Sequence, residues 1–85
     1  SMKKITIYTG DPCPFCAAAK ALLKTKNVEI EEFDIWKDPA KAKEMLQRTN
    51  GARTIPQIFI GDHYLGGNDQ LQEANRSGEL DKLLS

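Results

Sequence analysis

Apolar residues alternate with polar ones at the start of the chain and then take up a helical spacing. Ile5 and Ile7 are separated by single polar or aromatic residues, which predicts a strand over 5–8 with both isoleucines on one face. From residue 15 the apolar positions lie three and four residues apart, so we expect a helix that ends at about Lys26. The apolar positions on the core face of this helix are Phe15, Ala19 and Leu22.

The next stretch predicts a second strand and a second helix. Apolar residues indicate a strand over 28–35. Their parity changes at Glu31-Glu32: they stand at even-numbered positions before this pair and at odd-numbered positions after it, which indicates a bend or bulge. Asp38 is a helix cap and Pro39 suits the first helical position, so we expect a helix over 39–50. The positions expected on its core face are Ala42, Met45, Leu46 and Thr49.

The last third of the chain begins with a predicted hairpin. Its strands cover 56–60 and 63–65, and Gly61-Asp62 forms a tight turn between them. Asn68 and Asp69 suit the cap of a third helix that runs to about Arg76. A short last helix follows, and its apolar residues are Leu80, Leu83 and Leu84.

The predicted order of elements is β-α-β-α-β-β-α, which places the chain in the α/β class. Two strands joined through a helix are expected to be parallel with a right-handed crossover. Two strands joined by a two-residue turn are antiparallel. We therefore expect one mixed four-stranded sheet flanked by helices.

Length and charge narrow the possible functions. A chain of 85 residues makes one domain. Because Lys+Arg 12 balance Asp+Glu 12, no excess of positive charge favours nucleic acid or an anionic membrane, and we expect neither partner. No stretch approaches the roughly 20 apolar residues of a membrane span, and no apolar signal core is seen. We expect a cytoplasmic protein.

The chain has only two cysteines, Cys13 and Cys16, and they lie between the first predicted strand and the first predicted helix. Secreted domains of this size usually carry four or more cysteines, which argues against a structural disulfide. A zinc site needs about four ligands, and His63 is the single histidine, so no metal site is expected within one chain. A Cys-x-x-Cys pair in this strand-to-helix context is typical of redox chemistry.

The position of each cysteine predicts its role. The thiolate is the reactive form of cysteine, and the N–H groups and positive dipole end of a helix stabilise it. Cys13 lies at the helix start, with Pro14 suited to the first helical position, whereas Cys16 lies one turn further in. We therefore expect Cys13 to be the nucleophile and Cys16 the resolving thiol.

Three motifs together resemble those of a known family. Cys13-Pro14-Phe15-Cys16, Thr54-Ile55-Pro56 and Gly66-Gly67-Asn68-Asp69 occur in the order and spacing of a glutaredoxin of the thioredoxin-fold superfamily. The resemblance covers roughly residues 3 to 84, and implies a single glutaredoxin domain over 2–85 with a thioredoxin-like fold. It also implies a glutathione-dependent thiol-disulfide oxidoreductase, with glutathione as co-substrate and no tightly bound cofactor.

The resemblance also implies a glutathione site. Pro56 would be cis and lie against the cysteines, so that the Ile55 backbone pairs with the peptide of glutathione. Backbone N–H groups at Gly67 and Asn68 would take the γ-glutamyl carboxylate, and Asp69 its ammonium group. Phe15 and Thr54 would line the site, and Lys43 would bind the glycine carboxylate. Structural roles for the same residues remain open: a turn into a strand, a helix cap and a solvated lysine.

The chain departs from the family at three positions. Phe15 stands where a tyrosine is commonest, which removes a hydroxyl. Gly10 stands where many relatives carry a lysine, which removes a cation near Cys13. Asn68 stands where many relatives have a third cysteine. Outside these motifs, Trp36 and Tyr64 are expected to be partly in the core.

The expected partners are glutathione and proteins that are glutathionylated or contain disulfides, and a monomer is expected. Two alternatives remain open. The first is a redoxin reduced by thioredoxin reductase, acting as an electron donor to ribonucleotide reductase. The second is an iron-sulfur cluster carrier, in which Cys13 and glutathione from two chains bind one cluster. Pro14 argues against the carrier, because cluster-binding relatives usually have a smaller residue there.

Overall fold

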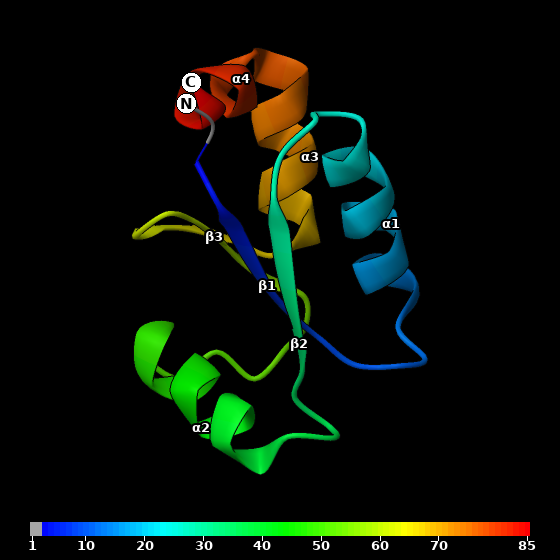
Figure 1. Ribbon diagram of the computed structural model, residues 1–85, viewed down its shortest axis with the longest axis vertical. Coiled ribbons are helices and arrows are strands. Elements are labelled where there is room, and N and C mark those ends of the chain that lie inside the picture. Colours follow the sequence, from blue (N-terminus) through cyan, green and yellow to red (C-terminus); the bar gives the residue numbers. More distant parts are fainter. Residues whose placement is uncertain (1–2) are drawn as a thin grey trace.

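The computed structural model describes residues 3–85, so the first residue of the expected domain, residue 2, lies outside the described part. The chain forms one mixed four-stranded sheet with the strand order β2-β1-β3-β4 (Figure 1). The parallel pair is β1 (Ile5–Thr9) with β2 (Ile30–Asp34). The antiparallel strands are β3 (Gln57–Ile60) and β4 (His63–Gly66). The predicted sheet is therefore confirmed.

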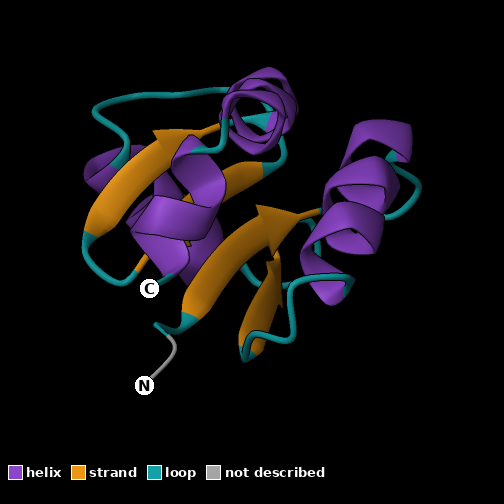
Figure 2. Cartoon of the chain, turned by 90° about the horizontal axis from the view of Figure 1, so that it is seen from above, coloured by secondary structure: helices purple, strands orange, loops and turns teal. Residues whose placement is uncertain are grey.

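Within residues 3–85, four helices cover the two faces of the sheet (Figures 1 and 2). On one face lie α1 (Pro14–Lys24), α3 (Asn68–Ser77) and the short α4 (Glu79–Leu84). On the other face lies α2 (Pro39–Arg48). None of the helices between residues 3 and 85 is long and apolar enough to cross a membrane.

The larger core lies between the sheet and the three helices α1, α3 and α4. Ile5 and Ile7 are fully buried there, as their alternation predicted. They pack with Leu23 of α1 and Leu71 of α3. Complete burial of an aliphatic side chain of this size contributes about 1.5–3 kcal/mol. This packing therefore holds the start of α1, with its two cysteines, at the edge of the sheet.

The smaller core lies under α2, and it corrects the prediction of a bend in the second strand. Strands β1 and β2 pair without interruption from Ile5 opposite Ile30 to Thr9 opposite Asp34. The parity of the apolar residues changes because β2 has two covered faces: Ile30 packs on the larger core and Phe33 on the smaller one. The register shift lies instead in the pairing of β3 with β4, beside Ile58.

Two of the predicted helix ends differ slightly from the structure. Helix α1 ends at Lys24 and not at Lys26, because the Thr25 hydroxyl and N–H both bond to the carbonyl of Leu22. Helix α2 ends at Arg48 and not at residue 50, because the Thr49 hydroxyl bonds to the Met45 carbonyl. The cap predicted at Asp38 is confirmed, since its carboxylate accepts the N–H groups of Ala40 and Lys41.

Four residues predicted in or partly in the core are exposed. Phe15 is 65% exposed because it lies in the first turn of α1, before the helix packs onto the sheet. Leu46 is on the outer side of α2. Tyr64, on the edge strand β4, covers only Phe59 with one face of its ring. Trp36, in the turn after β2, is 59% exposed.

Candidate active site

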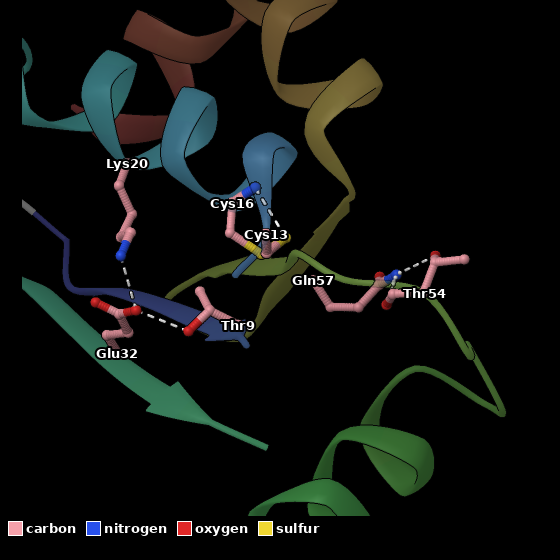
Figure 3. The surroundings of a disulfide bond; sticks show 7 residues. All are labelled: Thr9, Cys13, Cys16, Lys20, Glu32, Thr54 and Gln57. Carbon is pink, nitrogen blue, oxygen red and sulfur yellow. Dashed lines mark hydrogen bonds and ion pairs between the residues drawn. A yellow bond between two sulfur atoms is a disulfide. The ribbon is translucent and has the colours of Figure 1, made fainter. Parts of the chain in front are cut away.

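Cys13 is the residue that precedes the first turn of α1. Its backbone is extended, and Pro14 occupies the first helical position, as predicted. The N–H of Cys16 donates a hydrogen bond to the Cys13 sulfur at 3.2 Å. The two cysteines form a disulfide with their Cα atoms 5.2 Å apart (Figure 3). The helix start thus directs a backbone donor at the Cys13 sulfur.

The two cysteine residues differ in their exposure to solvent. Cys16 is only 1% exposed, whereas Cys13 is intermediate between buried and exposed. Cys16 is therefore the more enclosed of the two, as its place one turn into the helix predicted. An incoming disulfide can reach Cys13 first. This difference suits a nucleophile at Cys13 and a resolving thiol at Cys16.

A cleft of about 320 Å³ opens at Phe15, which lies between the two cysteines in the sequence. Every residue predicted to contact glutathione lines this cleft, with the exception of Lys43. The lining residues are Phe15, Thr54, Ile55, Pro56, Gly67, Asn68, Asp69 and Gln70. Segments from three distant parts of the sequence therefore meet at one place. Lys43 is exposed on α2 and stands outside this lining.

The sheet topology brings these segments together. Strand β1 leads into the cysteine loop, β3 is antiparallel to β1, and β4 is antiparallel to β3. The start of β3 and the end of β4 therefore lie at the same edge of the sheet as the end of β1. The peptide bond between Ile55 and Pro56 is cis, as expected from the resemblance. A Cβ atom at Gly67 would lie 3.3 Å from the Pro56 carbonyl oxygen, so the two loops pack tightly.

Gln70 is a cleft residue that was not predicted. Its Oε1 atom accepts the N–H of Gly67 at 2.8 Å, and Gly67 is the residue that caps α3. The prediction that Asn68 and Asp69 cap this helix is therefore wrong: they form its first turn. A glutamine three residues after a cap residue is the pattern of a capping box, and this pattern could have identified Gln70.

Gln57 supports the loop that precedes Pro56, and it too was not predicted. Its Nε2 atom donates to the carbonyl of Thr54 at 2.9 Å and to the Thr54 hydroxyl at 3.2 Å (Figure 3). The hydroxyl of Tyr64 donates to the other end of the Gln57 amide. Gln57 is buried, so these bonds satisfy polar atoms that would otherwise be left without partners. The Thr54 side of the cleft is thereby fixed.

A small polar group connects β1, β2 and α1 beside the disulfide (Figure 3). The Thr9 hydroxyl donates to the Glu32 carboxylate at 2.7 Å, and the Lys20 ammonium donates to it at 3.0 Å. The hydrogen bond from Thr9 is the main cause that lowers the pKa of Glu32, and Lys20 lowers the pKa further. Glu32 is therefore ionised at neutral pH, and Lys20 balances its charge.

The structure accounts for the absence of a lysine at residue 10. A Cβ atom built on Gly10 would lie 2.5 Å from the Cδ2 atom of the Trp36 ring, closer than real Cβ contacts come. Trp36 therefore occupies the space that a side chain at residue 10 would need. Gly10 is buried under the ring. This pairing of the two residues could not be found from the sequence spacing alone.

Comparison with known proteins identifies close relatives of this chain. The family model named Glutaredoxin matches residues 5–65. A probable glutaredoxin of Synechocystis sp. is 48% identical over 81 residues, which cover 95% of this chain and 92% of that protein. The solution structure of glutaredoxin from Brucella melitensis matches with a TM-score of 0.83 and 45% identity, over 99% of this chain and 90% of that chain.

A more distant match comes from a structure of a complex. The crystal structure of a buckwheat glutaredoxin-glutathione complex matches with a TM-score of 0.83 and 26% identity, over 94% of this chain and 74% of that chain. The family match covers more than half of the chain, and the expected thioredoxin-like α/β fold is confirmed. The resemblance suggested by the three sequence motifs is confirmed as well: the chain belongs to the glutaredoxin family of thiol-disulfide oxidoreductases.

Proposed function

We propose that this protein is a glutathione-dependent oxidoreductase that reduces glutathione mixed disulfides and protein disulfides. The observation that carries the proposal is the cleft at Phe15, two residues after Cys13, which is lined by the cis Ile55-Pro56 segment and by the start of α3. The buckwheat relative described above was solved as a complex with glutathione. A cytoplasmic location and a monomeric state stay predictions.

The lining of the cleft suits the groups that glutathione presents. The start of α3 offers backbone N–H groups and the positive end of a helix dipole, which would bind the γ-glutamyl carboxylate. The Asp69 carboxylate lies in the same first turn and would pair with the ammonium group. The Ile55 backbone would pair with the peptide of glutathione, between Thr54 and Phe15. Lys43 would reach the glycine carboxylate with its flexible side chain.

The first reaction requires only Cys13. Its thiolate attacks the glutathione sulfur of a glutathionylated protein, and the protein thiolate leaves and takes up a proton. Cys13 then carries glutathione as a mixed disulfide. The thiolate of a second glutathione attacks the bound glutathione sulfur, which releases oxidised glutathione and regenerates the Cys13 thiolate. The hydrogen bond from the Cys16 N–H would stabilise this thiolate.

The second reaction requires both cysteines. The Cys13 thiolate attacks a protein disulfide and forms a mixed disulfide with one of its sulfurs. The Cys16 thiolate then attacks the Cys13 sulfur, and the substrate leaves with both of its thiols reduced. The product is the Cys13–Cys16 disulfide that the structure contains. Two glutathione molecules reduce this disulfide and become oxidised glutathione.

A coupled assay tests the proposal. Reduced glutathione, glutathione reductase and NADPH are supplied with a glutathionylated protein, and the consumption of NADPH is followed. We expect the wild type and Cys16→Ser to turn over and Cys13→Ser to be inactive. Turnover with thioredoxin reductase and NADPH, but none with glutathione, would overturn the proposal. A brown, cluster-containing protein from anaerobic purification, without glutathione turnover, would overturn it in favour of the carrier.

The same assay tests the contact proposed for Lys43. Lys43→Gln removes the charge on α2, and Lys24→Gln removes a charge from an exposed lysine of α1 and serves as the control. We expect Lys43→Gln alone to raise the KM for glutathione, by a factor that shrinks as salt is added. Equal KM values for the two variants would exclude this contact.

A further inference from the structure

Trp36 is a large exposed aromatic residue that the proposed reaction does not use. It is 59% exposed, and one face of its ring covers Gly10. The turn that carries it is fixed, because the Asp34 carboxylate accepts the N–H groups of Trp36 at 2.9 Å and of Lys37 at 3.2 Å. Gly10 precedes Cys13 by only three residues. An anchored aromatic surface therefore lies beside the cysteine loop.

The strand order places Trp36 and the cleft on opposite sides of that loop. The strands run in the order β2-β1-β3-β4 across the sheet. At the edge where the cysteines lie, Trp36 follows β2, the cysteine loop follows β1, and the Ile55-Pro56 segment precedes β3. The cleft belongs to the β3 and β4 side of the edge. The loop that carries Cys13 therefore lies between the cleft and the turn that carries Trp36.

The disulfide bond of a substrate joins two halves, one on each sulfur. In this arrangement one half can bind in the cleft and the other can contact Trp36. The cleft of about 320 Å³ suits one small half such as glutathione. The other half of a protein substrate is a folded or extended polypeptide, which must lie on the surface around Cys13. The formal net charge is zero, so long-range attraction contributes little, and the choice among polypeptides depends on short-range contacts. Tryptophan is among the residues that contribute most at such contacts.

From this geometry we infer that Trp36 is a specificity-determining residue that contacts the polypeptide half of the substrate. The favoured polypeptides carry an apolar side chain next to the disulfide cysteine, which packs on the exposed face of the indole. This inference rests on the proposed function only in assigning the cleft to glutathione. A side chain at residue 10 would displace the indole, so Gly10 is required for the same surface.

Substrate preference is the direct test. Two glutathionylated peptides are compared, one with leucine and one with serine on both sides of the cysteine, in the wild type, Trp36→Ala and Leu46→Ala. Leu46 is an exposed apolar residue of α2 and serves as the matched control. We expect the wild type and Leu46→Ala to favour the leucine peptide by a factor of about 10 in kcat/KM, mainly through KM. In Trp36→Ala this ratio should fall towards one.

A binding measurement keeps the test independent of turnover. Trp36 is the single tryptophan of the chain, so its fluorescence reports on this surface alone. In Cys13→Ser, which lacks the proposed nucleophile, we expect the leucine peptide to shift the emission and the serine peptide to shift it much less. An unchanged substrate ratio in an active Trp36→Ala, or equal emission changes with both peptides, would overturn the inference. Loss of glutathione turnover in the wild type would instead overturn the proposed function.

Discussion

The hydroxyl of Tyr8 donates a hydrogen bond to the carboxylate of Glu44, and this bond connects β1 to α2. Arg48 donates to the same hydroxyl at 3.0 Å, and Lys41 donates to Glu44 at 3.2 Å. Tyr8 is fully buried, and Met45 is the buried residue of α2. Helix α2 is therefore attached to the sheet through the apolar cluster around Met45, through this polar group, and through the Lys41 and Arg48 cations, which lie over the Phe33 and Phe59 rings.

We expect Tyr8→Phe to lower the free energy of unfolding by about 1–2 kcal/mol, because a partly buried hydrogen bond to a charged group is lost. The ring is retained, so the packing against Phe33 and Phe59 stays unchanged. Urea unfolding measures the difference. The same substitution in a Glu44→Gln background serves as the control and should cost less. An equal cost in both backgrounds would show that the bond contributes nothing.

The same hydrogen bond predicts how stability depends on pH. The bond from Tyr8 is the main cause that lowers the pKa of Glu44 below its ordinary value of 4.5, and the bond from Thr9 does the same for Glu32. A carboxyl whose pKa is lower in the folded state contributes stability in full above 4.5 and loses it as the pH falls through the folded-state pKa.

We therefore expect the free energy of unfolding to decline as the pH falls below about 4.5. Urea unfolding over a series of pH values measures the slope. A variant with both Glu32→Gln and Glu44→Gln should decline less steeply than the wild type. If the two slopes agree, these carboxyl groups do not cause the acid sensitivity.

The contact between Gly10 and Trp36 predicts that one methyl group added at residue 10 lowers the stability of the fold. In Gly10→Ala the new Cβ atom would overlap the indole, so we expect the ring to move and the free energy of unfolding to fall by about 1–3 kcal/mol. Tryptophan emission should shift to longer wavelength as the ring gains contact with water. In a Trp36→Ala background the same substitution should cost almost nothing. If Gly10→Ala lowers the free energy of unfolding by a similar amount in both backgrounds, overlap with the Trp36 ring is not the cause.

Gln70 should affect the binding of glutathione and not the chemistry of Cys13. Its amide oxygen accepts a hydrogen bond from the N–H of Gly67, and its side chain packs against Gly66. Loss of a helix cap costs about 1 kcal/mol, so we expect Gln70→Ala to raise the KM for glutathione by a factor of about 5 with a smaller change in kcat. Gln47→Ala, on the exposed side of α2, is the control. A change confined to kcat would contradict this role.

Local patterns in the sequence predicted the frame of the site. Pro14 at the start of a helix, the cysteines at that start, and Gly67 before the next helix are signals within a few residues of chain. The expectation that Pro56 and Asp69 share one site with the cysteines came instead from the family resemblance of the three motifs, and both residues line the cleft together with Phe15. The fold followed from local patterns, since alternation and helical spacing are local properties.

Contacts between distant residues could not be predicted in this way. Trp36 lies on Gly10 only because β1 and β2 are neighbours, and Gln57 holds Thr54 only because of how that loop turns. The change of parity in β2 indicates a bend only if one face of the strand is covered, and α2 covers the second face. All three features are decided by how the elements pack together, and not by the local sequence.

In the proposed reaction the Cys13 thiolate receives glutathione, and capture of that adduct tests this step. Cys16→Ser is reduced, mixed with oxidised glutathione and analysed by mass spectrometry, intact and after proteolysis. Because no resolving thiol is present, the account predicts one glutathionyl group per chain, attached to Cys13, formed much faster than any adduct of Cys13→Ser. Absence of the adduct, or an equally fast adduct on Cys16 in Cys13→Ser, would contradict the account.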